Sequence, residues 1–149
     1  MQPVVEFVRL ERAEKAKVLC QLAQQFFGQK HRVLIRVEDA EQAMALDRYM
    51  WTWDRGSFLP HVWDNGAVEC YDEPITICTE ARNSNGATVL IAGAPCALDF
   101  SRRFRHVVDF AETWDDKRRA AARERFKLWR ELGCQPTMRE AHPLETGDE

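Results

Sequence analysis

The heptapeptide VVEFVRL at residues 4–10 is the first of two strand signals that each precede a helix signal. It is short and rich in β-branched and aromatic side chains, which predicts a strand. In residues 16–28 apolar side chains recur at i, i+3, i+4 and i+7, which predicts a helix that ends at Gly28. The sequence RVLIRV at residues 32–37 predicts a second strand, and Asp39 can cap a second helix. Strands alternating with helices indicate an α/β fold with a mainly parallel sheet.

The remainder of the chain continues this alternation after one interruption, residues 51–71, where the periodicity stops. Further strands are expected at residues 75–79, 87–92 and 106–110, and a long helix is expected at residues 115–132. The 149 residues match the size of one domain. We therefore expect residues 1–135 to form a single three-layer sandwich of the Rossmann-like or RecA-like kind, and residues 136–149 to form an acidic, flexible tail.

The sequence contains no motif that is typical of a cofactor-binding or metal-binding site. The connection after the first strand reads RLERAE where a glycine-rich phosphate-binding loop would have to lie, and the turn around Gly93 is only a weak nucleotide signal. The four histidines share no metal-ligand spacing and the five cysteines form no CxxC pair. The sequence also offers no secretion signal and no apolar run long enough to span a bilayer. A cytoplasmic protein without a cofactor or a metal is expected.

One segment, residues 49–63, is unusually aromatic. It holds five of the chain's 15 aromatic side chains, including Trp51 and Phe58. Such rings either fold back as a satellite of the core or anchor a partner, because they bury large areas and are favoured at interface hot spots. Glycine, proline and charged residues within the segment keep it near the surface, which favours a partner.

A second segment, residues 117–130 of the last expected helix, concentrates positive charge. It carries seven basic side chains and one acidic side chain, a net charge of +6, which leaves −9 for the rest of a chain whose net charge is −3. A period of 3.6 residues places Arg119, Arg123, Lys127 and Arg130 on one stripe with Phe126 at its flank. An almost unneutralised stripe of this kind favours an anionic partner.

The anion could be nucleic acid or an acidic peptide. Nucleic acid favours basic side chains spread over several elements, whereas the rest of this chain is acidic. A short acidic peptide with one apolar anchor fits a single stripe better, because arginines fork carboxylates and Phe126 offers an apolar contact.

Four motifs in these segments resemble the chi subunit family of bacterial DNA polymerase III. LDRYMW at residues 46–51 and SFLPH at residues 57–61 are similar to that family's L-D-x-x-L-W and S-F-[LV]-P-H. VVDF at residues 107–110 and ARERFK at residues 122–127, followed by Arg130, are similar to its V-V-D-F and A-R-E-R-[YF]-K-x-Y-R. The motifs occur in family order, and the resemblance spans about residues 4–133.

The resemblance implies a non-catalytic accessory subunit of the clamp-loader complex, with a RecA-like α/β fold and no nucleotide chemistry. It implies that the last helix binds the acidic C-terminal tail of single-stranded DNA-binding protein through Arg123, Phe126, Lys127 and Arg130. It also implies contact with the psi subunit, or with another clamp-loader subunit, through Trp51, Phe58, Pro60 and His61. The protein would then contact DNA only indirectly, through its partners.

Two other classes of function stay open at this point. One is a nucleotide-binding α/β enzyme that uses the sheet edge near Gly93. The other is a module whose last helix binds single-stranded DNA directly, with a steep dependence on salt.

Overall fold

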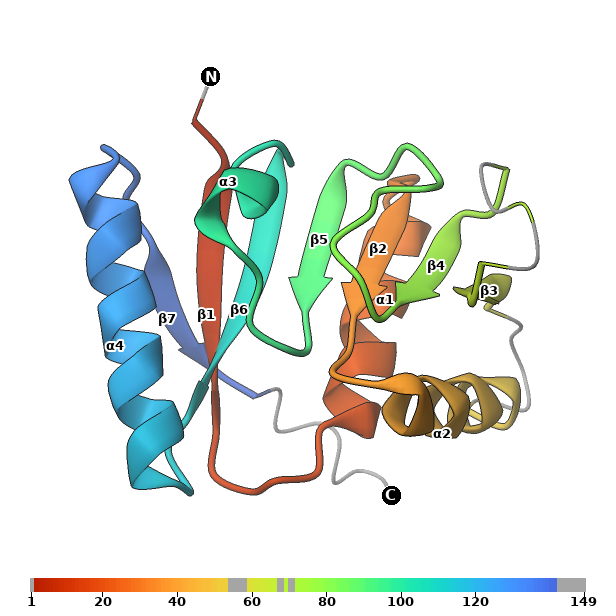
Figure 1. Ribbon diagram of the computed structural model, residues 1–149, viewed down its shortest axis with the longest axis horizontal. Coiled ribbons are helices and arrows are strands. Elements are labelled where there is room, and N and C mark those ends of the chain that lie inside the picture. Colours follow the sequence, from red (N-terminus) through yellow and green to blue (C-terminus); the bar gives the residue numbers. More distant parts are fainter. Residues whose placement is uncertain (1, 54–58, 67–68, 70–71, 142–149) are drawn as a thin grey trace.

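The computed structural model describes residues 2–53, 59–66, 69 and 72–141, and these residues form an α/β fold (Figure 1). In chain order the elements are β1 (Val4–Leu10), α1 (Ala16–Gly28), β2 (Val33–Arg36), α2 (Ala40–Trp51), β3 (His61–Asp64), β4 (Ile75–Cys78), β5 (Val89–Ala92), α3 (Leu98–Ser101), β6 (His106–Glu112), α4 (Asp116–Glu131) and β7 (Thr137–Glu140). The seven strands form one sheet in the order β3-β4-β2-β5-β6-β1-β7. Every pairing is parallel, which confirms and extends the expected mainly parallel sheet.

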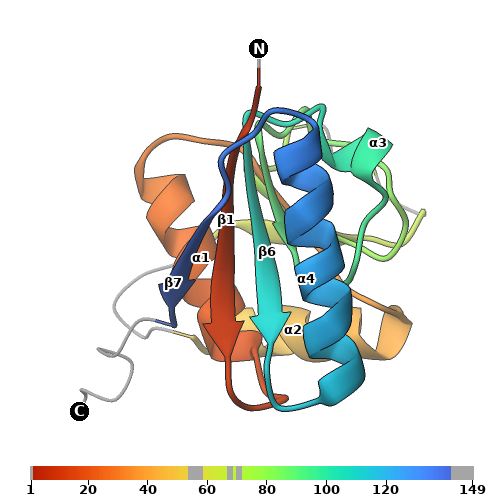
Figure 2. The ribbon, with the colours of Figure 1, turned by 90° about the vertical axis from the view of Figure 1, so that its left-hand side faces the viewer.

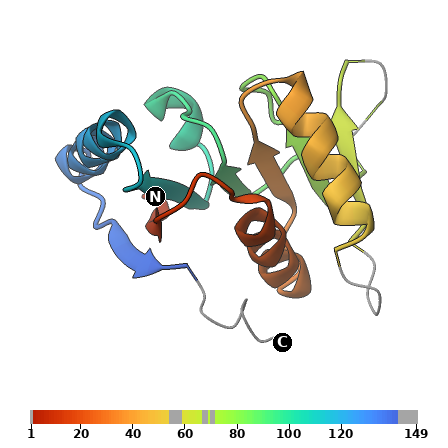
Figure 3. The same ribbon diagram turned by 90° about the horizontal axis from the view of Figure 1, so that it is seen from below.

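Helices cover both faces of the sheet, as a three-layer fold requires. Figure 2 shows α1 and α4 on opposite faces, and Figure 3 shows α3 on the same side as α4. Side chains alternate between two cores: in β2, Val33 and Ile35 belong to the core that includes residues of α1 and α2, whereas Leu34 belongs to the core that includes Trp129 of α4. None of the described helices is both long and apolar enough to cross a membrane.

Local sequence explains where the long helices begin and end. The carboxylate of Asp39 accepts a hydrogen bond from the backbone N–H of Gln42, and Asp115 caps α4 in the same way through Arg118. Gly133 follows α4 with a φ of 92°, a conformation that favours glycine. The cap at Asp39 and the end of α4 agree with the sequence-based expectation, and the cap at Asp115 adds to it.

Two strands lie where the sequence predicts none. β3 forms inside the stretch expected to be irregular, and β7 forms inside residues 136–149, the expected flexible tail. The expectation is therefore wrong for residues 137–140, which pair with β1 in parallel register. Ion pairs attach this edge strand, with Arg9 2.9 Å from Glu140 and Arg139 2.9 Å from Glu6. Residues 142–149 of the expected tail lie outside the described residues.

Candidate functional site

The last helix, α4, packs against the sheet with the orientation that its periodicity predicts. Ala122 and Trp129 face the sheet and are buried. Phe126 sits at the boundary, with its ring 5.1 Å from the ring of Phe7. Arg123 and Lys127 project from the exposed side. Packing against β1 and β6 therefore holds the basic stripe of α4 toward solvent.

Two hollows lie along α4 and share Arg123 and Phe126 in their linings. The first, of about 270 Å³, lies between α4 and the ends of three strands and is lined by Arg9, Ala111, Thr113, Arg119, Ala122, Arg123, Phe126 and Met138. The second, of about 460 Å³, is lined by Arg123, Phe126, Lys127, Arg130 and Glu131. We call these two hollows the α4 groove. It brings together all four residues that the resemblance assigns to peptide binding.

Two further lining residues of the α4 groove, Arg9 and Met138, were missed by the sequence analysis. Arg9 belongs to β1 and adds a cation at the end of the groove nearest Glu140. Met138 is exposed and belongs to β7, in the stretch expected to be a tail. The sequence around Met138 gives no strand signal, because a four-residue edge strand with both faces largely exposed shows no alternation of apolar side chains.

The basic side chains of α4 divide into two groups. Arg125 turns inward, where it donates to the buried carboxylate of Asp109 at 2.7 Å and to the backbone oxygen of Phe110. Arg118 lies 3.7 Å from Glu112, and Arg119 pairs with Asp116. In contrast, three stripe cations have no carboxylate partner among the described residues, namely Arg123, Lys127 and Arg130. These three are available to an anionic ligand.

The described side chains of the aromatic segment differ in burial. Trp53 packs against the core, and its ring nitrogen donates to the side chain of Gln24. Trp51, at the end of α2, is instead 58% exposed and lies 4.8 Å from the ring of His61. Part of the segment is thus a satellite of the core, and part is presented to solvent.

The ring of His61 packs against the exposed ring of Trp51. Its side chain is fully buried, with Nδ1 2.7 Å from the backbone oxygen of Leu59 and Nε2 3.1 Å from the carboxylate of Asp47. Pro60 lies next to it and is half-buried. We call Trp51, Pro60 and His61 the Trp51 surface. Phe58, the fourth residue expected there, lies outside the described residues.

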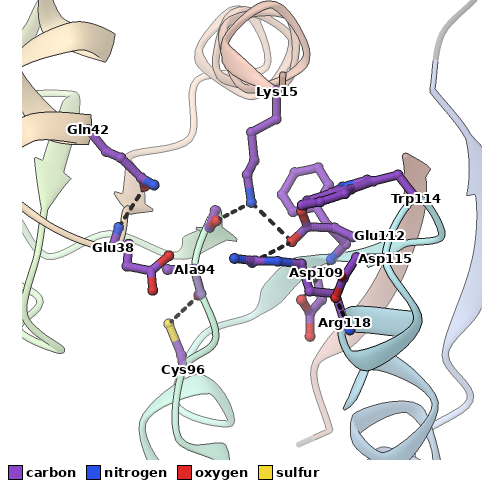
Figure 4. A network of polar contacts seen from close by, with 12 residues as sticks. Lys15, Glu38, Gln42, Ala94, Cys96, Asp109, Glu112, Trp114, Asp115 and Arg118 are labelled. Carbon is purple, nitrogen blue, oxygen red and sulfur yellow. Dashed lines mark hydrogen bonds and ion pairs between the residues drawn. The ribbon is translucent and has the colours of Figure 1, made fainter. Parts of the chain in front are cut away.

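At the carboxyl edge of the sheet, where α/β enzymes bind nucleotides, a hollow of about 330 Å³ is lined in part by Lys15, Gln42 and Gly93. Polar contacts within the chain occupy the part of this edge beside Glu112 (Figure 4). Lys15 precedes α1 and donates to the backbone oxygen of Gly93 at 2.6 Å and to the buried carboxylate of Glu112 at 3.1 Å. The indole nitrogen of Trp114 donates to the same carboxylate. A Cβ on Gly93 would lie 2.7 Å from the backbone oxygen of Arg36. Close backbone packing thus accounts for this glycine.

Thiol and metal chemistry find no support in the described residues. Burial raises the pKa of Cys20 and of Cys78 to about 12, so both thiols are protonated at neutral pH. The described part of the chain contains no cluster of three or more histidine, cysteine or acidic side chains that could hold a metal ion.

Comparisons with known proteins agree with one another. The family model described as "DNA polymerase III chi subunit, HolC" matches residues 2–137. The chain is 33% identical over 118 residues to the DNA polymerase III subunit chi of Escherichia coli, covering 78% of this chain and 79% of that protein. It is also 33% identical over 118 residues to the protein of the same name from Haemophilus influenzae, covering 78% of this chain and 81% of that protein. The corresponding protein of Pseudomonas aeruginosa is 27% identical over 119 residues.

Proposed function

Because the chain belongs to the DNA polymerase III chi subunit family, we propose that it is a non-catalytic accessory subunit that binds the acidic C-terminal tail of single-stranded DNA-binding protein. The α4 groove is the binding site in this proposal. Through it the chain tethers the DNA-covering protein to the polymerase.

The observation that carries the proposal is the pairing of free cations with an apolar floor in the α4 groove. Arg123, Lys127 and Arg130 have no carboxylate partner among the described residues, and they surround Phe126. An acidic peptide supplies the missing carboxylates, and arginine binds a carboxylate through two parallel hydrogen bonds. The peptide's terminal phenylalanine ring enters the hollow between Phe126 and Met138.

The proposed contact is small and charged, and therefore weak and sensitive to salt. A dissociation constant on the order of micromolar corresponds to about −8 kcal/mol. The exposed cations are screened within about 10 Å at 0.1 M salt, so affinity falls as ionic strength rises.

Fluorescence anisotropy with a labelled acidic peptide that ends in phenylalanine tests the site. Arg123→Ala removes a charged hydrogen bond of about 1.5–3 kcal/mol, which weakens binding by about 10- to 150-fold. Arg48→Ala is the matched control, because it removes the same charge from an exposed position on α2, away from α4. Equal affinity of wild type and Arg123→Ala would refute the assignment.

In this proposal the protein has a second partner, the psi subunit or another clamp-loader subunit, which binds the Trp51 surface. An exposed tryptophan that rests on a buried, hydrogen-bonded ring is held in place before binding, so little side-chain entropy is lost when a partner covers it. Trp51 and Pro60 form the described part of this contact, whereas His61, which the resemblance also assigns to it, is buried and positions Trp51. Phe58 is assigned to the contact from the family motif alone.

A further inference from the structure

Exposed basic side chains gather at the amino edge of the sheet, where the parallel strands begin. Arg102, Arg103 and Arg105 lie in the turn between α3 and β6, and Lys30 and Arg32 lie in the turn between α1 and β2. We call these five residues the amino-edge surface. The sequence does not reveal it, because the two turns are far apart in the chain and acidic residues outnumber basic ones outside residues 117–130.

Backbone hydrogen bonds hold the two turns of the amino-edge surface side by side. Thr88, just before β5, accepts a hydrogen bond from the N–H of Arg105 at 2.9 Å, and its own N–H donates to the backbone oxygen of Arg32 at 3.1 Å. β5 lies between β2 and β6, so two strand spacings of about 4.8 Å place the two arginine backbones about 10 Å apart. The basic side chains therefore form one row along the edge.

Most of these cations have no acidic partner. Among the described residues, Lys30 and the three arginines of the α3–β6 turn make no ion pair. Glu6, near the start of β1, is already neutralised by His106 at 2.6 Å and by Arg139 at 2.9 Å. The amino-edge surface thus keeps four cations that can bind an external anion.

The amino-edge surface adjoins the end of α4. Burial raises the pKa of the Cys134 thiol, and the guanidinium of Arg102 lies close enough to oppose that shift. Phe104, two residues after Arg102, packs in the same core as Cys134. α4 ends at this edge of the sheet (Figure 1), with Arg130 in its last turn. The basic stripe of α4 therefore continues into the amino-edge surface.

The chemistry of this surface favours a nucleic acid over an acidic peptide. Phe100 and Phe104, the aromatic side chains of α3 and of the turn after it, are 8% and 3% exposed, so they offer no anchor for an apolar side chain of a peptide. Cations contributed by several elements instead match the repeated phosphates of a nucleic-acid backbone. A single strand can follow such a row from α4 onto the sheet edge, whereas a duplex is stiff over about 150 base pairs.

We propose that the amino-edge surface binds the phosphate backbone of single-stranded DNA. The contact is made by guanidinium and ammonium groups to phosphates, so it does not depend on base sequence. The inference goes beyond the proposed function and does not require it. If both hold, α4 binds the tail of the DNA-covering protein while the neighbouring edge binds the DNA itself.

The salt dependence of binding measures the number of phosphate contacts. Four cations, at about −0.7 for each contact with a single strand, give a slope of about −2.8 in a plot of log K against log salt concentration. Fluorescence anisotropy with a labelled thymidine oligonucleotide should therefore show an affinity about 50-fold lower at 200 mM than at 50 mM NaCl. A duplex of the same length should bind more weakly than the single strand, and tighter binding to the duplex would exclude the single strand as the ligand.

The decisive variant combines Arg103→Ala with Arg105→Ala. It should lose about tenfold or more in affinity at 50 mM NaCl, and its salt slope should become shallower by about 1.4. The matched control combines Arg12→Ala with Arg48→Ala, which removes the same charge from exposed positions toward the opposite edge of the sheet. Lysine at both positions 103 and 105 should restore most of the affinity, because a phosphate contact needs the charge and not the guanidinium plane. The melting temperatures of all variants check that they are folded.

The outcomes separate this inference from the proposed function. Equal affinity and equal salt slope in the decisive variant and the control overturn the inference. A loss of DNA binding in Arg123→Met combined with Lys127→Met, but not in the decisive variant, places DNA on α4 and overturns it as well. A loss of acidic-peptide binding in the decisive variant, with DNA binding unchanged, gives the amino-edge surface to the peptide. DNA binding that depends on Arg103 and Arg105, in a protein that does not bind the peptide, supports the inference and overturns the proposed function.

Discussion

Arg123 and Arg125 lie two residues apart on α4, and the same substitution at each should have opposite consequences. Arg125 is held between α4 and β6: its guanidinium donates to both oxygens of Asp109, at 2.7 and 3.1 Å, and to the backbone oxygen of Phe110. Its side chain is 21% exposed and that of Asp109 is 8% exposed. Arg123 is exposed and has no such partner among the described residues. Arg125 therefore stabilises the fold, whereas Arg123 is free to bind a ligand.

Arg125→Met keeps the apolar stem and removes the charge, so a buried carboxylate loses its partner. Breaking a buried ion pair costs about 3–5 kcal/mol, and the residual exposure of Arg125 places the loss near about 3 kcal/mol. In a domain of this size that loss lowers the melting temperature by roughly 6–12 °C. Arg123→Met, at an exposed position, should change the free energy of unfolding by less than about 0.5 kcal/mol.

Urea denaturation followed by circular dichroism measures both free energies, and peptide anisotropy measures binding at a temperature where both variants are folded. Arg125→Met should bind the acidic peptide within about twofold of wild type, and Arg123→Met should lose about tenfold or more. Equal stability losses in the two variants, or a folded Arg125→Met that binds as poorly as Arg123→Met, would refute the reasoning. A double-mutant cycle with Asp109→Asn isolates the pair itself.

Three further predictions concern other parts of the molecule. The Trp51→Ala variant should lose clamp-loader subunits in a pull-down, while its melting temperature stays near that of wild type. Trp114 is a second exposed tryptophan, and the Trp114→Ala variant should retain these subunits. If Trp51→Ala recovers the same subunits, the Trp51 ring is not needed for the contact. Gly93→Ala should lose about 1–3 kcal/mol of stability by chemical denaturation, because its Cβ would lie 2.7 Å from a backbone oxygen of β2; an unchanged midpoint contradicts the packing explanation. The hydrogen bond from His106 lowers the pKa of Glu6 below its ordinary value of 4.5, so the stabilisation by ionised Glu6 is complete above that value and is lost as the pH falls through the lower pKa of the folded protein. The destabilisation of Glu6→Gln should accordingly be largest at neutral pH and shrink below pH 4.5 in urea denaturation, and a pH-independent difference counts against the ion pair.

Short-range signals are enough to predict the central part of the fold. Short runs rich in β-branched and other apolar side chains place β1 and β2, and the caps Asp39 and Asp115 fix where α2 and α4 begin. β3 and β7 are four-residue strands at the two sheet edges, where one neighbouring strand is enough. The residues of β3 are buried or half-buried on both faces and those of β7 are largely exposed on both, so neither strand has one buried and one exposed face. Their sequences therefore need no apolar period, and only the finished sheet determines that they pair.

The candidate site shows the same division between local and tertiary information. Helical periodicity alone places Arg123, Lys127 and Arg130 on one exposed stripe. It cannot show that Arg125 leaves the charged surface, because that depends on where Asp109 of β6 lies beneath α4. The contribution of Met138 depends on the pairing of β7 with β1, which joins residues about 130 positions apart.

The strand order has a mechanical consequence for a protein proposed to hold two partners. The Trp51 surface includes β3 at one edge of the sheet, and the α4 groove borders β7 at the other. Six strand spacings of about 4.8 Å separate these edges by about 29 Å. Partners bound at the two ends would not collide, and a hydrogen-bonded sheet between them resists bending and stretching. The sheet would thus act as a stiff spacer, which keeps the two partners at a fixed distance from each other and transmits tension between them.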